Sequence, residues 1–541
     1  MEQSSDLLNK KLKNYYLTMS KRRERKEKIM ISNIKTISLN GIDGNLVEVQ
    51  TDIAGGLPNI EIVGLPDISV KESKERIKTA IKNSEIEFPS RKIVINLAPA
   101  STRKEGTSYD LPIAVGILQA LGEIIADNLE NTIFIGELSL DGKINRINGV
   151  LPMCIEAMNL GIKRVILPKS NEREASVIKN LEIIGVKNLR EVVDYLNKTI
   201  EISPTKIDIL KEFNKKDKQD LDFCEVKGQE NVKRALEIAA AGGHNCLLIG
   251  PPGSGKTLTA RRIPTILPDL TFEEALEVTK IHSISGMLDN DIGIVTKRPF
   301  RSPHHTISPT SMIGGGKIPK PGEISLAHNG VLFLDELPEF NRNTLEVLRG
   351  PLEDRNVTIS RLYSKVIYPS NFMLIASMNP CPCGYYGSTE KECQCSKMAI
   401  EKYLNRISGP LLDRIDLHVE VKPVKYQKLD SDNKVETSKE IKERVNKARR
   451  IQFLRYKDAN IFSNSELTPK MIEKYCKLNQ ECKQILELAF NKLGLSARAY
   501  SRILKVARTI ADLDEKQNIE KQHLLEAIQY RSLDRKYGDK F

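Results

Sequence analysis

The sequence predicts an α/β fold in which a phosphate-binding P-loop follows a strand of a parallel sheet. The apolar run 246–249 reads as a buried strand, and the segment 258–262 beyond the loop permits a helix. Two further apolar runs, 331–334 and 372–376, lead into polar residues, as the strands of a parallel sheet do at a ligand-binding edge. Strand, Gly-rich loop and helix in this order form the context that a P-loop requires. The loop consists of Gly250, Pro251, Pro252, Gly253, Ser254, Gly255, Lys256 and Thr257.

The residue types of the loop predict ATP and Mg²⁺ as cofactors. Glycines let successive backbone N–H groups converge on phosphate oxygens, and the helix N-terminus adds partial positive charge. Lys256 is expected to reach the β- and γ-phosphates, and the Thr257 hydroxyl to bind Mg²⁺. The alternative, a chance Gly-rich turn before a helix, requires all eight positions to match by accident.

The two later apolar runs supply the remaining groups of such a site. The first ends in Asp335 and Glu336. We expect Asp335 to hold Mg²⁺, directly or through water, and Glu336 to act as the general base on the attacking water. The second run leads to Asn379, whose amide is expected to orient that water. A single strand that ends in two carboxylates usually reflects only the polarity of strand ends. Three apolar strands that lead into polar residues in this order argue against that interpretation.

Composition narrows the class of protein. The chain has 541 residues, 40% of them hydrophobic, which suits roughly three to four domains with packed cores. No apolar run approaches the ~20 residues of a membrane span, so no membrane association is expected. Nine cysteines without a visible signal peptide indicate reduced thiols and a cytoplasmic location. The net charge of +12 is compatible with a nucleic-acid partner without establishing one.

Charge and periodicity divide the chain into five segments. The first is a basic extension that we expect to be disordered, with a nucleic-acid-binding arm as the alternative. An α+β domain, a charged linker, a nucleotide-binding core and a mostly helical end follow it. Their predicted bounds are 1–30, 31–200, 201–222, 223–424 and 425–541.

Local patterns support these assignments. In the second segment, helices are predicted over 110–122 and 151–160, and Asp141-Gly142 predicts a hairpin turn between 133–140 and 143–147. In the last segment, Thr468-Pro469 predicts a helix start, with an N-cap followed by proline at the first helical position.

Longer motifs extend the pattern beyond the P-loop: 328–336 (HNGVLFLDE), 378–384 (MNPCPCG) and 409–416 (GPLLDRID). With them, residues 31–535 closely resemble the YifB/ComM family of magnesium-chelatase-like AAA+ ATPases. The resemblance implies an AAA+ P-loop NTPase core with a helical lid, preceded by a Lon-protease-like domain of the S5 fold.

The resemblance also implies roles for arginines outside the P-loop. Arg414 corresponds to an arginine finger that acts on the ATP of a neighbouring subunit, with Arg406 as the alternative. A surface arginine paired with Asp413 or Asp416 is the purely structural interpretation. Arg498 corresponds to the sensor-2 arginine of the lid, which reaches back to the nucleotide. A finger that works only in trans implies a homo-oligomeric ring, most often a hexamer.

Two insertions point to DNA as a partner. Residues 314–320 and 357–367 resemble insertions of magnesium chelatase and of MCM helicases, which line the pore of ring motors. Arg361 and Lys365 lie near the tip of the second insertion, and a basic tip suits a phosphate backbone. A solvated hairpin without DNA contact would have the same pattern.

Peptidase activity is not expected from the Lon-like segment. Ser108 stands where Lon carries its nucleophile, but Leu151 occupies the position of the partner lysine, although Lys143 is nearby.

The four cysteines of the segment 381–395 suit a structural Zn²⁺. They form two Cys-x-Cys pairs, and four thiolates are a common tetrahedral zinc set. Free or redox-active thiols are the alternative. These residues are Cys381, Cys383, Cys393 and Cys395.

The leading interpretation is therefore an ATP-hydrolysing ring motor on single-stranded or branched DNA. The resemblance implies a helicase or branch-migration factor in the recombination of incoming DNA. The alternatives are an ATPase subunit of a metal-chelatase-like or protein-remodelling complex, and a scaffold in which ATP is only a structural ligand.

Overall fold

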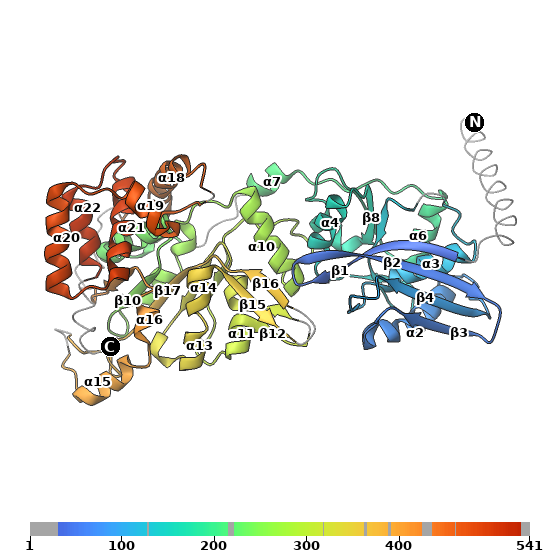
Figure 1. Ribbon diagram of the computed structural model, residues 1–541, viewed down its shortest axis with the longest axis horizontal. Helices are drawn as coiled ribbons and strands as arrows, with labels where there is room; N and C mark the ends of the chain where they lie inside the picture. The colour runs from blue at the N-terminus through green and yellow to red at the C-terminus, as the bar shows by residue number, and fades with distance from the viewer. Residues whose placement is uncertain are drawn as a thin grey trace. The chain divides into compact units, whose positions relative to one another are not determined.

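The computed structural model describes residues 31–126, 129–214, 221–317, 319–361, 365–387, 391–424, 435–459 and 461–531 (Figure 1). The basic extension 1–30, residues 215–220 of the predicted linker and residues 532–541 lie outside the described part of the chain. The chain divides into two compact units, of which the first comprises 1–215 with 279–295 and the second comprises the rest.

The segment 279–295 is therefore grouped differently from the boundaries that the sequence predicted, which assigned it to the ATPase core. Within the first unit, the Ser283 hydroxyl donates to the buried carboxylate of Glu174. The Gly149 backbone N–H donates to the Ser283 carbonyl, 3.1 Å away. These polar partners explain why the segment belongs to this unit, although it lies between parts of the core in sequence.

A seven-stranded mixed sheet forms the centre of the first unit, in the order β3-β4-β2-β1-β5-β8-β9. Strands β1, β2 and β4 are antiparallel neighbours, whereas β5, β8 and β9 run parallel. In β4 the side chains of Ile93, Ile95 and Leu97 are buried and their neighbours are not, which is the alternation of a sheet with one covered face. The bounds are β1 Ile31–Asn40, β2 Asp43–Ala54, β3 Asn59–Val63, β4 Lys92–Ala98, β5 Thr132–Phe134, β8 Arg164–Pro168 and β9 Glu182–Val186.

The helices of this unit confirm both helices predicted there. Helix α3 is buried along almost its whole length, because it is apolar on every side and packs against α2 and the sheet. A short helix, α7, forms inside the segment that was predicted to be a linker. The bounds are α2 Ile68–Asn83, α3 Asp110–Ala120, α4 Val150–Asn159, α5 Glu172–Ala175, α6 Leu189–Leu196 and α7 Ile209–Asn214.

The hairpin predicted at Asp141-Gly142 forms between β6 (Glu137–Leu138) and β7 (Ile144–Asn145). It is shorter than predicted because Ile133 belongs to β5, whose neighbours are β1 and β8 of the main sheet.

In the second unit, five parallel strands have the order β11-β14-β17-β10-β18. With the five strands numbered in chain order, this is the arrangement 2-3-4-1-5. The three predicted strands are present, and β10, β14 and β17 are buried at every position, as expected for a parallel sheet covered on both faces. The bounds are β10 Cys246–Ile249, β11 Phe300–Arg301, β14 Val331–Leu334, β17 Met373–Met378 and β18 Leu417–Glu420.

Helices surround this sheet and continue into a helical lid of α18 to α22. Helix α10 (Phe272–Ser285) crosses the boundary between the units in sequence. The others are α8 Glu230–Gly242, α9 Lys256–Ala260, α11 Pro309–Ile313, α12 Glu323–Leu326, α13 Arg342–Glu346, α14 Arg349–Asp354, α15 Lys397–Leu404, α16 Gly409–Leu412, α18 Ser438–Arg455, α19 Pro469–Tyr475, α20 Gln480–Leu493, α21 Ala497–Leu513 and α22 Lys521–Gln529. Helix α19 starts after Thr468, as predicted.

Both insertions form hairpins. Strand β12 (Gly314–Gly315) pairs with β13 (Lys320–Pro321), and β15 (Asn356–Ser360) pairs with β16 (Lys365–Pro369). Residue 318 and the tip residues 362–364 lie outside the described residues.

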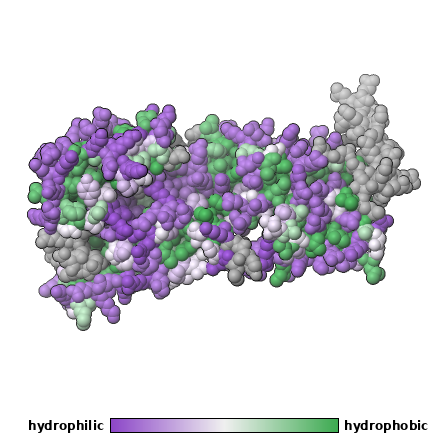
Figure 2. All heavy atoms as spheres, viewed as in Figure 1, coloured by the Kyte–Doolittle hydropathy of each residue, from purple (hydrophilic) through white to green (hydrophobic). Residues whose placement is uncertain are grey.

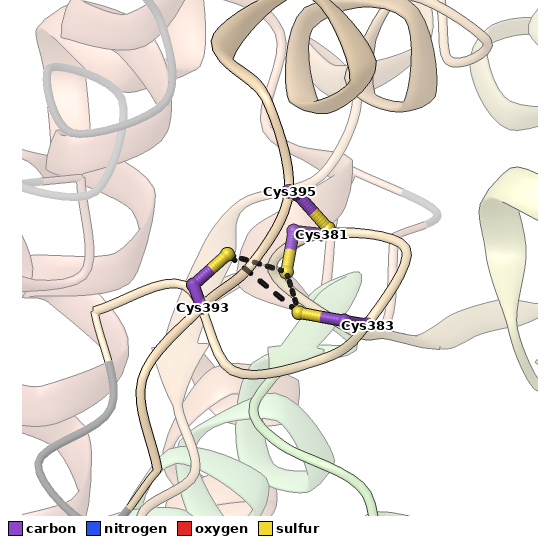
Figure 3. A group of neighbouring side chains, drawn as sticks. All are labelled: Cys381, Cys383, Cys393 and Cys395. Carbon is purple, nitrogen blue, oxygen red and sulfur yellow. Dashed lines mark hydrogen bonds between the residues drawn. The ribbon is translucent and has the colours of Figure 1, made fainter.

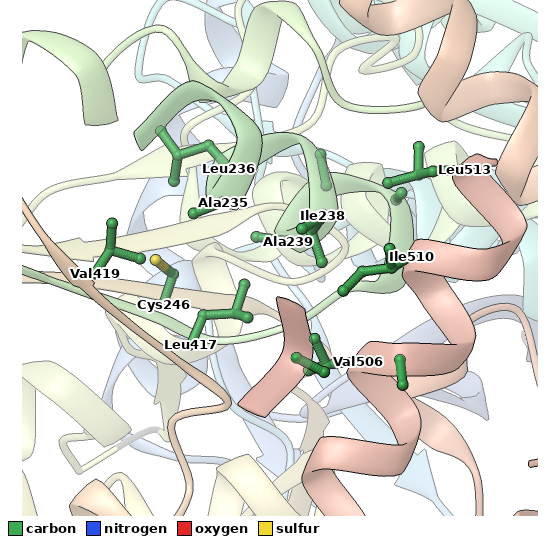
Figure 4. Packing of buried hydrophobic residues seen from close by; sticks show 14 of the residues in the cluster. Ala235, Leu236, Ile238, Ala239, Cys246, Leu417, Val419, Val506, Ile510 and Leu513 are labelled. Atoms are coloured by element: carbon green, nitrogen blue, oxygen red, sulfur yellow. The ribbon is translucent and has the colours of Figure 1, made fainter. Parts of the chain in front are cut away.

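The lid packs on the core through helix α8 (Figure 4). Side chains of α8 lie between those of strands β10 and β18 on one side and those of α21 on the other, within one hydrophobic cluster. Alanines in α8 allow this close approach. The residues labelled in Figure 4 are Ala235, Leu236, Ile238, Ala239, Cys246, Leu417, Val419, Val506, Ile510 and Leu513. The face of the lid that is visible in Figure 2 is mainly hydrophilic.

A buried polar network fixes the lid at the amino edge of the sheet. His244, which precedes β10, contacts Asp416 through Nδ1 (3.2 Å) and the Thr509 hydroxyl of α21 through Nε2 (2.7 Å). Arg502 of α21 also pairs with Asp416. The part of α21 that carries Arg502 and Thr509 therefore lies at the end of the sheet from which β10 and β18 begin.

In the part of the chain that the structure describes, no helix is both long enough and apolar enough to span a membrane.

Candidate functional site

The P-loop joins β10 to α9 and leaves an open space for phosphate. Gly253 and Gly255 have φ values of 75° and 87°, a region that favours glycine. A Cβ atom built on either residue meets nothing within 4 Å, so the space beside the loop is open at both positions. A Cβ on Gly250 would overlap the Val421 carbonyl oxygen, so this position requires glycine for packing. The open loop at a helix N-terminus fits a phosphate group.

Lys256 connects the loop to the third predicted strand. Its Nζ donates to the carbonyl oxygens of Gly250 (2.8 Å) and Pro251 (2.9 Å) and to Oδ1 of Asn379 (3.1 Å). Burial lowers the pKa of Lys256, while the charges of Asp335 and Glu336 oppose that shift. The structure thus brings together the lysine, both carboxylates and the asparagine that the sequence singled out.

Asp335 lies beside Thr257, as a shared Mg²⁺ would require. The Thr257 hydroxyl donates to Asp335 Oδ2 at 2.7 Å, and the Ser377 hydroxyl donates to the other carboxylate oxygen. Hard oxygen donors that converge in this way suit Mg²⁺, so the residues present fit the predicted ion.

Glu336 follows in a strained backbone conformation. Its φ is 55°, which is uncommon outside glycine and costs roughly 1–3 kcal/mol. Its backbone N–H donates to Ser377 Oγ at 3.3 Å, and its side chain is exposed. Its carboxylate is therefore accessible to solvent, as the predicted general base would need to be.

Two residues of this site were not predicted. Ser377 is a fully buried hydroxyl in an otherwise apolar strand, and that polarity was the available signal. Gln229 precedes α8 and donates through Nε2 to the carbonyls of Ser254 (3.0 Å) and Lys422 (2.8 Å). No local pattern marked Gln229, because both of its partners are distant in sequence.

At the amino edge of the same sheet lies a cavity of about 670 Å³, which we call the arginine cavity. Asn245, which immediately precedes β10, is part of its lining. More cationic than acidic residues line the cavity, five against three. Its cationic residues are Arg355, Arg414, Arg498, Arg502 and Lys505, and its acidic residues are Glu353, Asp416 and Glu466.

Arg414 is buried and fully engaged at this cavity. Its Nε donates to the Arg349 carbonyl (3.1 Å) and its Nη1 to the Pro410 carbonyl (2.6 Å). Its Nη2 pairs with Glu353 at 2.6 Å. The purely structural interpretation proposed Asp413 or Asp416 as its partner, but Asp416 pairs with Arg502 and His244.

Arg498 shares the arginine cavity with Arg414 and lies away from the P-loop. Its side chain is exposed and makes no hydrogen bond or ion pair with any residue in the described ranges. Strand β10 separates the cavity from the P-loop, and four residues of a parallel strand span about 13 Å. The structure therefore brings the two predicted arginines together, on the edge opposite Lys256.

Arg406, the alternative finger, lies at the other edge. Its Nη1 donates to the Pro338 carbonyl (3.2 Å) and pairs with Glu339 (2.8 Å), both in the turn that follows Glu336. Arg406 is thus adjacent to the P-loop edge of its own chain.

The four cysteines of 381–395 converge, with all sulfur atoms within 4.8 Å of one another (Figure 3). The Cys381 sulfur lies 3.3 Å from that of Cys383 and 3.6 Å from that of Cys393. A tetrahedral zinc with Zn–S bonds of about 2.3 Å separates its sulfurs by about 3.8 Å, so these residues fit the ion. Burial raises the pKa of Cys383. The Tyr385 backbone N–H and the neighbouring thiols outweigh that effect and lower this pKa to about 6.

Exposed cations lie on both insertion hairpins. A Cβ built on Gly315 would lie 2.9 Å from Nη2 of Arg361, so the hairpins are in contact there. The exposed cationic residues are Lys317, Lys320, Arg361 and Lys365.

In the first unit, the lysines near the predicted Lon-like position are engaged elsewhere. Lys143 pairs with Asp141 at 2.7 Å, and Leu151 is fully buried in α4. Lys104 is buried and donates to the carbonyl oxygens of Pro99 and Thr102.

Three family models match this chain. "Subunit ChlI of Mg-chelatase" matches residues 49–171, "Magnesium chelatase, subunit ChlI" matches 222–429, and the ChlI C-terminal model matches 435–531.

Two curated relatives match nearly the whole chain. It is 44% identical to "Competence protein ComM" of Haemophilus influenzae, over 91% of this chain and 96% of that protein. It is also 44% identical to "Uncharacterized protein YifB" of Escherichia coli, over 93% and 98%. A partial match, 30% identical over 31% of this chain and 34% of that protein, is to "Lon protease 2" of Bacillus subtilis.

Proposed function

The chain belongs to the YifB/ComM family of magnesium-chelatase-like AAA+ proteins, and on that premise we propose that it is an ATP-hydrolysing motor that works as a homo-oligomeric ring on DNA. The observation that carries the proposal is the position of the arginine cavity at the sheet edge opposite the P-loop. An arginine so placed cannot serve the nucleotide of its own chain without crossing the length of β10.

ATP hydrolysis is assigned to the P-loop edge. Lys256 would exchange its contacts with the loop carbonyls for oxygens of the β- and γ-phosphates. Thr257 and Asp335 would hold Mg²⁺, which when bound neutralises charge on the phosphate oxygens. Glu336 would take the proton of the attacking water, and Asn379 would orient that water from the position where its amide now contacts Lys256.

Arg414 and Arg498 are assigned to the nucleotide of a neighbouring copy of this chain. Arg414 would stabilise the transition-state charge as an arginine finger, a role that contributes ~10³–10⁵ in rate in related NTPases. Arg498, which has no partner among the described residues, would contact the same phosphates from α21. If each subunit supplies these arginines to the nucleotide of the next, the subunits form a closed ring. We propose that this ring has six subunits.

DNA is the proposed substrate, with single-stranded or branched DNA favoured. The exposed cations of the two hairpins suit contact with a phosphate backbone. The relative from Haemophilus influenzae is named a competence protein, which supports a role in the recombination of incoming DNA.

We also propose that the four cysteines hold a structural Zn²⁺. All nine cysteines of the chain are free thiols, which suits the reducing cytoplasm that we propose as the location.

The first test is the ATPase rate of the purified protein without DNA and with single strands, duplex and four-way junctions. Lys256→Ala provides the blank. A several-fold increase with single strands or junctions supports the DNA motor. Hydrolysis that no DNA changes would instead favour a metal-chelatase-like or protein-remodelling ATPase.

A further inference from the structure

The cysteine cluster lies directly beside the ATP site. Strand β17 ends at Met378, Asn379 and Pro380 follow, and the next residue is Cys381, which is fully buried. Asn379 is therefore fixed by the sheet on one side and by the cluster on the other. Its Oδ1 accepts a hydrogen bond from Lys256, so any shift of Cys381 is transmitted to the lysine of the P-loop.

A second contact joins the cysteine loop to the P-loop itself. Gly384 has a φ of 85°, and a Cβ atom placed on it would overlap the ring of Pro252. The Cys-x-Cys-Gly turn thus rests on the tip of the P-loop without room for a side chain. Its backbone is held to the cluster, because the Gly384 N–H donates to the Cys381 carbonyl (3.0 Å) and the Tyr386 N–H to the Cys381 sulfur (3.3 Å).

A third connection follows the second cysteine pair. Helix α15 begins two residues after Cys395, with Ser396 as its N-cap. It buries Tyr403, whose side chain interacts with the backbone of Asn379. Both cysteine pairs are thus linked to Asn379, one through the chain and one through α15.

We propose that Zn²⁺ bound by Cys381, Cys383, Cys393 and Cys395 positions Asn379 and the P-loop, so that occupancy of the metal site sets the rate of ATP hydrolysis. The inference rests on the ATPase and zinc assignments proposed above and adds a link between them. The four sulfurs come from two Cys-x-Cys segments, and a metal that binds all four would hold these segments at one separation. Loss of the metal lets the pairs separate and releases Asn379 and the Gly384 turn. The cysteines are positioning residues, since they act through Asn379 and Pro252.

The test measures zinc content, kcat and KM for ATP on the full chain without DNA. Cys393→Ala is expected to lose zinc and to lower kcat by about 10- to 100-fold, the usual effect of removing an outer-shell support, with a smaller change in KM. Cys393→His keeps a zinc ligand and should recover most of both. Cys224→Ala, a partly exposed thiol outside the cluster, is the matched control and should change neither. Loss of zinc with unchanged kcat overturns the proposal, as does wild-type protein without zinc.

A second variant tests the link while the metal stays in place. Gly384→Ala should retain zinc and still lower kcat, because the new methyl group displaces the turn from Pro252. Gly55→Ala, where a Cβ meets nothing within 4 Å, is its control. If Cys393→Ala precipitates, Gly384→Ala tests the proposal by itself. An unchanged kcat of Gly384→Ala with zinc still bound would reject the link between the cysteine cluster and the ATP site. A failure of DNA to stimulate hydrolysis does not affect these basal rates, so the two proposals fail separately.

Discussion

The two edges of the parallel sheet in the second unit carry functional groups in different states. At the carboxyl edge, Lys256 contacts Asn379 and Thr257 contacts Asp335, so the groups that would bind one nucleotide are already together. At the amino edge, cationic side chains line a cavity and Arg498 has no partner among the described residues. One edge is a nearly complete site. The other carries arginines that are mostly paired with carboxylates, and among its described residues Arg498 alone has no partner.

This difference supports the proposal that each chain carries parts of two sites. An ATP site that is complete in one subunit needs no second arginine cavity on the far side of the sheet. The proposed ring would account for both edges, because the amino edge of one subunit would then complete the carboxyl edge of the next. Variants at the two edges should therefore behave differently when they are mixed.

The largest effect is expected at the carboxyl edge. Lys256→Ala should abolish measurable hydrolysis and weaken ATP binding, because no other side chain can replace its contacts with phosphate. Glu336→Gln should keep ATP binding and lose about 10²–10⁴ in kcat, the usual contribution of a general base. Steady-state hydrolysis and titration with a fluorescent ATP analogue separate the two. Normal turnover by Glu336→Gln would exclude it as the base.

The next largest effect is expected from Arg414→Ala, with a loss of about 10³ in kcat, at the lower end for an arginine finger. Chains with Arg414→Ala and chains with Lys256→Ala should be inactive alone and partly active when mixed, because a mixed ring contains some interfaces with both intact residues. Arg406→Ala, at the opposite edge, is the control. Mixing Arg406→Ala chains with Lys256→Ala chains should not restore activity in this way. If mixing restores nothing, Arg414 does not act in trans.

Asp416 tests whether charge holds the lid at the amino edge. Asp416→Ala should lower the free energy of unfolding by about 3–5 kcal/mol, because Arg502 would be left without its buried partner. Burial raises the pKa of Asp416. Arg502, His244 and Lys505 outweigh that effect and hold this pKa well below the ordinary 3.8. The stabilisation is therefore complete above about pH 4 and is lost as the pH falls through the lowered pKa. Thermal unfolding from pH 7 to pH 3 should show the beginning of this loss in the wild type and a weaker pH dependence in the variant.

Most of the carboxyl edge could be predicted from sequence, because its groups follow directly after three apolar strands. The strand 246–249, the loop 250–257 and the pair Asp335 and Glu336 each carry a local signal that tertiary structure does not alter. Ser377 and Gln229 could not be predicted with the same certainty, since their partners are fixed only when distant segments pack together.

The amino edge shows the limit of motif-based prediction. The motifs identified Arg414 and Arg498 as candidates, but not that they line one cavity away from the P-loop of the same chain. That placement depends on the packing of α21 against α8 and on the network around His244, which joins residues hundreds of positions apart. The grouping of 279–295 with the first unit has the same origin, since Glu174 and Gly149 are its distant partners.

Arg498→Ala should have a smaller effect than Arg414→Ala. A hydrogen bond to a charged group contributes about 1.5–3 kcal/mol, so kcat/KM should fall roughly 10- to 100-fold. If Arg498 serves the neighbouring subunit, mixing with Lys256→Ala chains should restore part of the activity, as for Arg414. A different outcome is that activity recovers in the mixture with Arg414→Ala chains but not in the mixture with Arg498→Ala chains. That result would place Arg498 at the nucleotide of its own chain, and the lid would then have to move to bring it there.

The smallest effect is expected from Glu353→Gln, which removes the one anionic partner of Arg414 in the described structure. Glu353 is about half exposed, so the pair contributes at most ~1 kcal/mol, and the melting temperature should change little. Arg414 keeps its two carbonyl contacts, but its charge is no longer neutralised within the chain. ATPase activity should therefore rise slightly, by no more than about fivefold for an energy of that size. A decrease in activity would show that Glu353 holds the finger in its working position rather than competing with phosphate for it.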